Sequence, residues 1–196
     1  MKKRKVLVFG SNGLVGNSLV RILGNSDKVS NLVTSNRTDT DLFSFQDTKK
    51  TIENVMPDLV INAAAKVGGI HANDTMPVRF LLDNLRIQNA VIDGAFEQGV
   101  SKLLFLGSSC IYPVHAVQPM AEDSLLTGPL EATNQWYAIA KITGIKLCQA
   151  LRKQFGVNFI SAMPTNLYGP HDNYHPTESH VVAALIRRFH QAKLEN

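Results

Sequence analysis

Short apolar runs recur along the chain with the composition of buried β-strands. They cover residues 5–9, 30–34, 59–62, 103–106 and 158–162, and each is rich in residues that suit a strand buried on both faces. Between them lie segments with helical spacing, such as 80–96, where the apolar residues fall on one broad face. The pattern therefore predicts strands and helices in alternation.

Alternation of strands and helices is typical of a parallel sheet. Crossovers in such sheets are right-handed, and their helices cover both faces. We therefore predict an α/β fold with a doubly wound, Rossmann-like parallel sheet, whose ligands bind at the carboxyl ends of the strands. The chain changes character after the fifth strand, at Pro164 and the polar stretch 169–179, and a last helix is expected at 181–193.

Composition narrows the class of protein. The 196 residues are 44% hydrophobic and 18% charged, which suits one core rather than two full domains. Two cysteines, Cys110 and Cys148, argue against a disulfide scaffold and predict a cytoplasmic protein. The apolar run at 6–9 is too short for a signal peptide or a membrane span, and no other window is long enough. We expect no membrane association.

Charge gives little sign of a nucleic-acid partner. The net charge is +4, but four basic residues are packed into positions 2–5, directly before the first strand. A basic stripe and interleaved aromatic residues are both missing. We therefore interpret the basic cluster as a solvated lead-in and predict no binding to nucleic acid.

A glycine-rich turn directly follows the first strand and opens a helix at 14–23. A tight turn, a close approach to pyrophosphate and close helix packing each forbid a side chain at such glycines. The spacing is GxxGxxG, and a glycine triplet alone is a weak signal, but this one lies between strand and helix. The residues predicted to bind a dinucleotide here are Gly10, Ser11, Asn12, Gly13, Leu14, Val15 and Gly16.

The second strand is expected to end near the nucleotide's ribose. Nineteen residues past Gly16 the chain reads Ser35-Asn36-Arg37, where an NAD site would carry an acid. An arginine can pair with a 2′-phosphate, so we predict NADP(H). Asp39 and Asp41 weaken this prediction, and Arg37 could be an ordinary surface arginine. Asp41 and Leu42 could instead lie against the adenine.

A tyrosine and a lysine, Tyr137 and Lys141, are spaced to share one face of a helix. Tyrosine titrates near ~10 and is a poor acid or base at neutral pH unless a nearby ammonium stabilises its phenolate. Such a pair also occurs by chance, as a half-buried tyrosine beside a surface lysine, but the glycine turn upstream favours catalysis. Ser108 and Ser109 follow the fourth strand, where a hydroxyl can donate to a developing alkoxide.

At these positions the sequence resembles the extended short-chain dehydrogenase/reductases. Gly10, Ser108, Tyr137 and Lys141 match that family's motifs, and the strings at 63–70, 106–113, 137–141 and 164–173 resemble its members that act on a GDP-linked 4-keto-6-deoxy sugar. The resemblance covers essentially the whole chain, yet that family's chains continue with two more strands and most of the sugar-nucleotide domain. It implies an NADP-binding Rossmann-like domain over 1–170 and the start of a substrate-binding region over 171–196.

The resemblance implies NADPH-dependent 3,5-epimerisation and 4-reduction of GDP-4-keto-6-deoxy-D-mannose to GDP-L-fucose, by a homodimer. Ser108, Tyr137 and Lys141 would then reduce the ketone, and Cys110 and His180 would exchange protons at C3 and C5, which the C4 ketone acidifies. Further cofactor contacts are implied for Leu106, Gly107, Lys141, Pro164, Thr165, Asn166, Leu167 and His180, and substrate contacts for Ser108, Ser109, Tyr137, Asn166 and Arg188.

Several of these residues have plainer interpretations. Cys110 could be a small buried hydrophobe, and His180 a surface or helix-capping residue. Lys66 and Arg188 could meet a substrate or simply be solvated, and Asn84 could brace the active-site helix or be an ordinary polar residue. His171, His175 and His180 are spaced too irregularly to predict a metal site.

Two other functions stay open at this point. A related NAD-dependent sugar-nucleotide 4-epimerase or dehydratase would recycle a tightly held NAD, and Cys110 and Arg37 argue against it. A non-catalytic dinucleotide-binding protein is the second, and the presence of Ser108, Tyr137 and Lys141 argues against it.

Overall fold

Five strands alternate with helices in the computed structural model, which describes residues 2–176 and 178–195. The strands are β1 (Arg4–Phe9), β2 (Val29–Ser35), β3 (Leu59–Asn62), β4 (Lys102–Leu106) and β5 (Asn158–Ala162). The α-helices are α1 (Leu14–Gly24), α2 (Phe45–Val55), α3 (Ile70–Thr75), α4 (Pro77–Glu97), α5 (Gln135–Phe155) and α6 (Val181–Glu195). Two short 3-10 helices, η1 (Ser109–Ile111) and η2 (Glu122–Ser124), follow β4. The predicted strands are confirmed to within one residue at each end.

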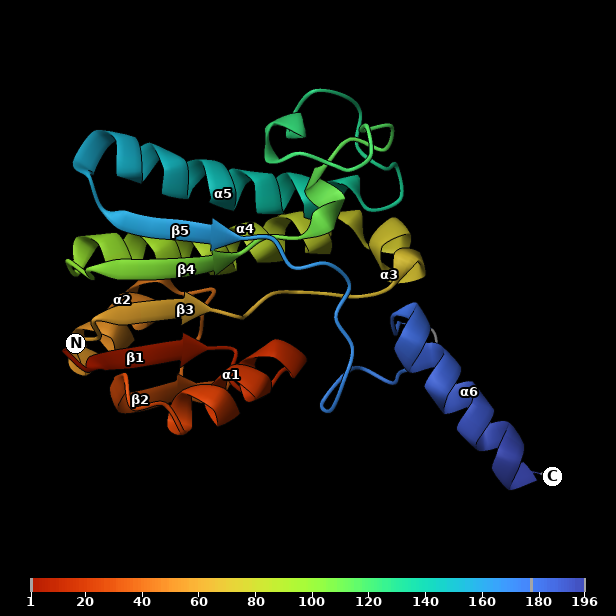
Figure 1. Cartoon of the computed structure of the whole chain (residues 1–196), viewed down its shortest axis with the longest axis horizontal. Coiled ribbons are helices and arrows are strands. Elements are labelled where there is room, and N and C mark those ends of the chain that lie inside the picture. The colour runs from red at the N-terminus through yellow and green to blue at the C-terminus, as the bar shows by residue number, and fades with distance from the viewer. Residues whose placement is uncertain (1, 177, 196) are drawn as a thin grey trace.

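All five strands are parallel and lie in the order β2-β1-β3-β4-β5 (Figure 1). The chain leaves β1 for β2 on one side and then returns to β3 on the other. This reversal places a switch point between β1 and β3, and the crevice above the carboxyl ends of these strands is where ligands of such sheets bind. The predicted α/β fold class is confirmed.

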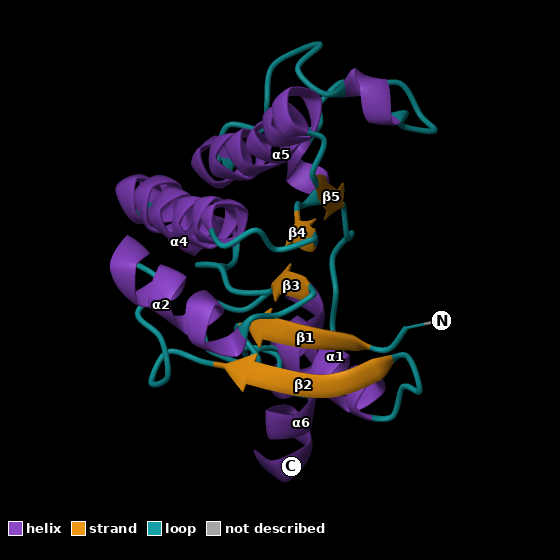
Figure 2. Cartoon of the chain, turned by 90° about the vertical axis from the view of Figure 1, so that its left-hand side faces the viewer, coloured by secondary structure: helices purple, strands orange, loops and turns teal. Residues whose placement is uncertain are grey.

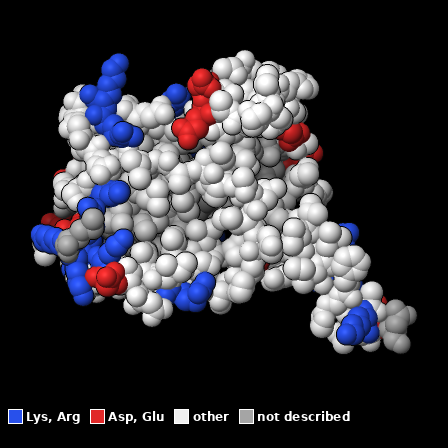
Figure 3. Space-filling model, in the orientation of Figure 1, with Lys and Arg blue, Asp and Glu red and all other residues white. Residues whose placement is uncertain are grey.

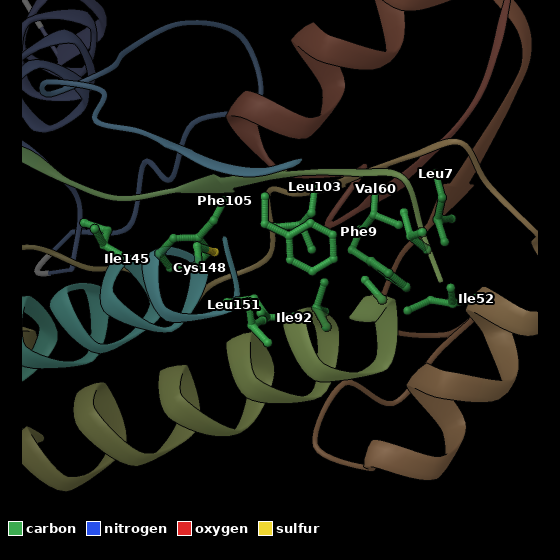
Figure 4. Close-up of a cluster of buried hydrophobic side chains, with 14 of the residues drawn as sticks. Leu7, Phe9, Ile52, Val60, Ile92, Leu103, Phe105, Ile145, Cys148 and Leu151 are labelled. Carbon is green, nitrogen blue, oxygen red and sulfur yellow. The ribbon is translucent and has the colours of Figure 1, made fainter. Parts of the chain in front are cut away.

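The main core lies between the sheet and the layer formed by α2, α4 and α5 (Figure 2). Leu7 and Phe9 of β1 and Phe105 of β4 meet Ile52 of α2 and Ile92 of α4 there, all of them fully buried (Figure 4). Successive strand residues point to opposite faces of the sheet. Val6 and Val8 therefore form a second, smaller cluster on the other face.

This second face of the sheet is covered unevenly. Leu19 and Leu23 of α1 pack on the smaller cluster, whereas α6 projects away from the sheet (Figure 1). Ser161 and Ala162 at the end of β5 are exposed. The expected helical layer on both faces is thus complete on one face, and among the described residues it is partial on the other.

Lys and Arg side chains gather where the N-terminus lies, at the amino ends of the strands (Figure 3). The carboxyl edge lies at the other end of the sheet, so the basic lead-in is remote from the crevice. None of the helices in the described ranges has the length and hydropathy needed to cross a membrane.

Candidate active site

The carboxyl edge of the sheet opens into a cavity of about 370 Å³, a size that suits a small-molecule site. Its wall combines segments that are far apart in the sequence. The predicted residues that line it are Gly13, Leu14, Val15, Arg37, Leu106, Gly107, Ser108, Tyr137, Lys141, Pro164, Thr165, Asn166, Leu167 and His180. The glycine turn, the arginine and the tyrosine–lysine pair therefore belong to one site.

The three glycines of the turn are needed for different reasons. Gly10 has φ +78°, and a Cβ there would lie 2.6 Å from the amide nitrogen of Ala64. A Cβ at Gly16 would lie 2.0 Å from the carbonyl oxygen of Gly10. At Gly13, which caps the start of α1, the nearest protein atom would be 3.6 Å away, an ordinary contact. The bare backbone at Gly13 therefore serves the cavity, where it leaves a helix N-terminus open to an anion such as pyrophosphate.

Arg37 lies in the turn after β2, and its exposed side chain lines the cavity. The two nearby carboxylates are held by their own loop: Asp39 accepts a hydrogen bond from the Asn36 amide and Asp41 one from the Phe43 amide, each at 2.9 Å. Within residues 2–176 and 178–195 the ion pairs are Lys49–Glu97 and Arg79–Asp83, so no carboxylate neutralises Arg37. Its guanidinium is available to a phosphate.

Two residues predicted for the adenine lie outside the cavity wall. The amide of Asp41 donates to the carboxylate of Asp47 at 2.6 Å. Leu42 packs against the main core cluster. The structure thus gives both residues a role in folding the β2–α2 loop, and a contact with adenine stays a prediction.

Tyr137 and Lys141 lie one turn apart on α5, as their spacing predicts. Nζ of Lys141 donates to the carbonyl oxygen of Leu106 at 2.9 Å and lies 5.6 Å from the centroid of the Tyr137 ring. Burial lowers the pKa of Lys141 to about 8 and raises the pKa of Tyr137 above its ordinary value, because both charged forms lose water. Tyr137 is therefore a neutral phenol at neutral pH, which suits a proton donor.

The Tyr137 ring is also held by packing. It meets the fully buried Phe80 of α4 edge to face, with 6.4 Å between ring centroids and 79° between ring planes. This contact uses the ring and not the hydroxyl.

The lowered pKa of Lys141 predicts a pH-dependent stability difference between the wild type and Lys141→Met. Between pH 8 and 10.5 the unfolded lysine binds a proton that the folded one has mostly lost, so this group makes wild-type stability rise with pH. We expect Lys141→Met to gain stability relative to the wild type at pH 7 and to lose about 1–3 kcal/mol of that gain by pH 10.

Urea denaturation of both proteins at several pH values measures this difference. The lost hydrogen bond to Leu106 weakens the variant. The other titrating groups are present in both proteins, and the pKa of Cys110 rises further in the variant because the Lys141 charge is lost. A stability difference that stays constant from pH 7 to 10 would contradict the buried ammonium.

Ser108 follows β4 through Gly107, whose amide donates to the carbonyl of Ala162 in the neighbouring strand at 2.8 Å. Sγ of Cys110 donates to Oγ of Ser108 at 3.3 Å. Burial raises the pKa of the Cys110 thiol, and the bond to Ser108 and the charge of Lys141 oppose this only in part. Cys110 is thus a protonated thiol linked to the cavity through Ser108. Ser109 does not line the cavity, and its carbonyl accepts from Tyr112.

After β5 the chain crosses the carboxyl edge of the sheet and reaches α6 (Figure 1). Pro164 to Leu167 line the cavity along this path, and His180 lines it directly before α6 begins. Arg188 lies further along α6, is exposed, and is not part of the wall. No three His, Cys, Asp or Glu side chains gather in the described ranges to hold a metal ion.

Two buried polar residues on the apolar face of α4 brace the site. Asn84 accepts a hydrogen bond from the Lys66 amide at 2.9 Å and donates to the Lys66 carbonyl at 3.0 Å, so it holds the loop after β3 and not α5. Gln88 donates to the Ala140 carbonyl of α5 at 2.7 Å. In the sequence each of these residues is a polar residue on an apolar helix face. That pattern predicts a buried hydrogen bond but does not identify its partner. The Lys66 Nζ lies 5.9 Å from the Phe80 ring centroid and outside the cavity wall.

Sequence reasoning missed two asparagines in the cavity wall, Asn62 at the end of β3 and Asn73 in α3. Both are buried. Nδ2 of Asn62 and Oδ1 of Asn73 have no hydrogen-bond partner within the described part of the chain. Neither residue belongs to a spacing that points to chemistry, so only the fold reveals them.

The chain is similar over almost its whole length to proteins named GDP-L-fucose synthase. It is 55% identical over 193 residues to the GDP-L-fucose synthase of Sinorhizobium fredii and 50% identical over 196 residues to that of Escherichia coli. These alignments cover 98% and 100% of the chain but 61% of each relative, so the chain spans about three fifths of the length of the curated relatives it matches.

Two solved structures are similar to the chain as well. A GDP-L-fucose synthetase from Naegleria fowleri bound to NADP superposes with a TM-score of 0.87 and 31% identity, over 97% of this chain and 62% of that one. A GDP-D-glycero-L-gluco-heptose synthase from Campylobacter jejuni, solved in the presence of NADPH, superposes with a TM-score of 0.90 and 36% identity, over 99% and 56%.

Residues 6–196 match the profile of a family described as "NAD dependent epimerase/dehydratase family". Because this match spans almost the whole chain, and because the glycine turn and the tyrosine–lysine pair share one cavity, the protein belongs to the NAD-dependent epimerase/dehydratase family.

Proposed function

We propose that the chain forms the NADPH-binding and catalytic part of an enzyme that acts on GDP-4-keto-6-deoxy-D-mannose. The enzyme would epimerise this sugar at C3 and C5 and reduce it at C4, yielding GDP-L-fucose. The observation that carries this proposal is the single cavity shared by Gly13, Arg37, Ser108, Tyr137 and Lys141. The relatives named GDP-L-fucose synthase support the choice of substrate. Residues 1–170 would be the cofactor domain and 171–196 the start of the substrate-binding region.

The cofactor fits the residues present. Gly13, Leu14 and Val15 offer the N-terminus of α1 to a pyrophosphate. Arg37 has no ion-pair partner in the described part of the chain and offers its guanidinium to a 2′-phosphate. Leu106, Gly107 and Pro164 to Leu167 line the cavity near Tyr137 and Lys141, where the nicotinamide would lie. When bound, NADPH supplies the hydride for C4.

Reduction needs a proton on the C4 oxygen as the hydride arrives at carbon. Tyr137 is the donor in this proposal, because its phenol is neutral and lines the cavity. Lys141 stabilises the phenolate that remains, and the Ser108 hydroxyl donates to the developing alkoxide. The hydrogen bond from Lys141 to Leu106 fixes the ammonium beside the tyrosine ring.

Epimerisation needs one group to remove a proton and another to return it on the opposite face. Cys110 and His180 are the proposed pair, since a thiol and an imidazole can both accept and return a proton. His180 and Ser108 both line the cavity, and Cys110 is hydrogen-bonded to Ser108. Ser108 and Tyr137 would hold the enolate oxygen during both inversions, so one oxyanion site would serve all three steps.

Incubation of the 196-residue chain with GDP-4-keto-6-deoxy-D-mannose and NADPH in heavy water tests this function. We expect NADPH oxidation and a product with deuterium at C3 and C5, with NADH as the poorer reductant. Binding of NADPH without oxidation would identify a non-catalytic dinucleotide-binding protein. The 4-epimerase or dehydratase would instead be identified by turnover, without net cofactor oxidation, of a GDP-linked sugar that carries a hydroxyl at C4.

Cofactor preference gives a separate prediction at Arg37. We expect Arg37→Glu to weaken NADPH binding about tenfold to a hundredfold, because charge-assisted hydrogen bonds to the 2′-phosphate are lost and repulsion replaces them. NADH has no such phosphate, so its affinity should change little. Fluorescence titration with both cofactors measures the two effects.

Arg21→Glu is the matched control, since Arg21 is an exposed residue of α1 that does not line the cavity. It makes the same change in net charge and should leave both affinities near the wild-type values. Equal losses of NADPH and NADH affinity in Arg37→Glu would show that Arg37 does not recognise the 2′-phosphate.

A further inference from the structure

Gly69, directly before α3, makes an unusually close contact with the chain that leads to α6. Its amide donates to the carbonyl of Glu178 at 2.9 Å. A Cβ at Gly69 would lie 2.8 Å from the carbonyl oxygen of Ser179, closer than a side chain can approach a backbone atom. The contact between residue 69 and residues 178–179 therefore requires glycine.

The backbone around Gly69 is itself held in place. Nδ2 of the buried Asn73 donates to the carbonyls of Gly68 at 2.9 Å and Gly69 at 3.0 Å. A Cβ at Gly68 would lie 3.0 Å from the ring of Phe80, so the preceding residue is packed against the core as well. We call Gly68 and Gly69, with their Asn73 brace, the Gly69 seat.

The Gly69 seat lies next to the proposed epimerisation residue. Ser179 directly precedes His180, whose side chain lines the cavity and whose carbonyl accepts from the Ala184 amide at 2.9 Å in the first turn of α6. Figure 1 shows this end of α6 beside α3. His180 itself is exposed, so its own surroundings restrain it little. The hydrogen bond from the Gly69 amide restrains the chain two residues before His180.

We infer that Gly69 is a positioning residue: its missing side chain lets residues 178–179 dock on the loop after β3, and this docking delivers the His180 imidazole to the cavity. Gly69 itself does not line the cavity, although Gly68 and Asn73 beside it do, so its effect on the site passes through its neighbours and His180 and not through contact with a ligand. The inference rests on the proposed function only for the role of His180. The docking itself is a property of the chain without ligands.

Gly69→Ala tests the inference by NMR on chain labelled at histidine, with the His180 ring signal assigned by loss in His180→Gln. In the wild type we expect NADP⁺ to shift the His180 signal. In Gly69→Ala we expect NADP⁺ to bind with a Kd raised less than about tenfold, because the turn at 10–16 and Arg37 are untouched. The change that NADP⁺ causes in the His180 chemical shift should fall by at least about half, because the imidazole would lie further from the cavity.

Gly24→Ala is the matched control, because a Cβ at Gly24 would meet its nearest neighbour at 3.9 Å. It should retain the wild-type shift. A full His180 shift in Gly69→Ala would overturn the inference, since the imidazole would then reach the cavity without the contact.

Amide hydrogen exchange of the wild type is a second test that needs no variant and no cofactor. The bond to Glu178 should protect the Gly69 amide at least about a hundredfold relative to an unstructured chain. An unprotected Gly69 amide would overturn the inference even if Gly69→Ala failed to fold. If NADP⁺ shifts no histidine signal while the Gly69 amide is protected from exchange, the cofactor proposal fails. In that case the docking of residues 178–179 on Gly69 stands.

Discussion

Tyr137→Phe is expected to lower the rate of NADPH oxidation in the presence of GDP-4-keto-6-deoxy-D-mannose by about a hundredfold to ten-thousandfold, the range for loss of a positioned general acid. Burial raises the pKa of Tyr137, so its hydroxyl carries the proton that the C4 oxygen needs. The phenylalanine keeps the edge-to-face contact with Phe80. Folding and NADPH affinity should therefore be retained. The measurement is the rate of NADPH loss, with affinity taken from a separate titration.

The matched control is Tyr168→Phe. The Tyr168 side chain is 69% exposed and does not line the cavity, so removal of its hydroxyl should leave the rate unchanged. If Tyr137→Phe oxidises NADPH at the wild-type rate, Tyr137 does not donate the proton, and the catalytic assignment of the whole tyrosine–lysine pair fails.

Alanine at two glycines of the same turn is expected to separate folding from cofactor binding. In Gly16→Ala the new Cβ meets the Gly10 carbonyl oxygen at 2.0 Å and Cα of Ser11 at 2.8 Å, both of them backbone atoms that cannot rotate away. We expect a loss of about 1–3 kcal/mol in the free energy of unfolding, as for overpacked sites, and loss of NADPH binding as the turn opens.

Gly13→Ala should behave in the opposite way. Its Cβ meets the protein only at an ordinary distance, so the free energy of unfolding should stay within about 0.5 kcal/mol of the wild-type value. The same methyl group stands between the N-terminus of α1 and the cavity. We expect NADPH affinity to fall about tenfold or more, since each charge-assisted hydrogen bond to pyrophosphate is worth about 1.5–3 kcal/mol.

Urea denaturation and fluorescence titration of both variants give the four values needed. Unchanged NADPH affinity in Gly13→Ala would mean that pyrophosphate does not rest on this helix terminus. Unchanged stability in Gly16→Ala would mean that the turn relaxes without cost, and the close packing of α1 on the turn would then not be essential.

Local sequence was enough to predict the strands, the turn and the shared helix face of Tyr137 and Lys141. Strands of a parallel sheet are buried on both faces, so their apolar runs stand out whatever surrounds them, and all five were found. The spacing of Tyr137 and Lys141 depends only on helix geometry. The glycine turn is local only in part. Gly16 is constrained by Gly10 and Ser11, whereas a Cβ at Gly10 would meet Ala63 and Ala64 in the loop after β3.

The braces of the site were not predictable in the same way. Asn84 and Gln88 are both polar residues on the apolar face of α4, but one holds Lys66 and the other holds Ala140 of α5. Their partners lie 18 and 52 residues away in the chain, and the choice between them depends on how α4 packs against its neighbours. No sequence pattern predicted a role for Asn73, which becomes evident only from the packing of α3 beside residues 178–180.

The sequence by itself determined which elements form and which residues are candidates for the site, because hydrophobic periodicity, glycine conformation and helical spacing act over a few neighbouring residues. The tertiary structure alone decided that Arg37 has no ion-pair partner among the described residues and that Tyr137 and Lys141 are buried with their pKa values moved in opposite directions. It also decided that Gly69 contacts the chain directly before His180. These properties arise from desolvation and from contacts between distant segments, which exist only once the chain has packed.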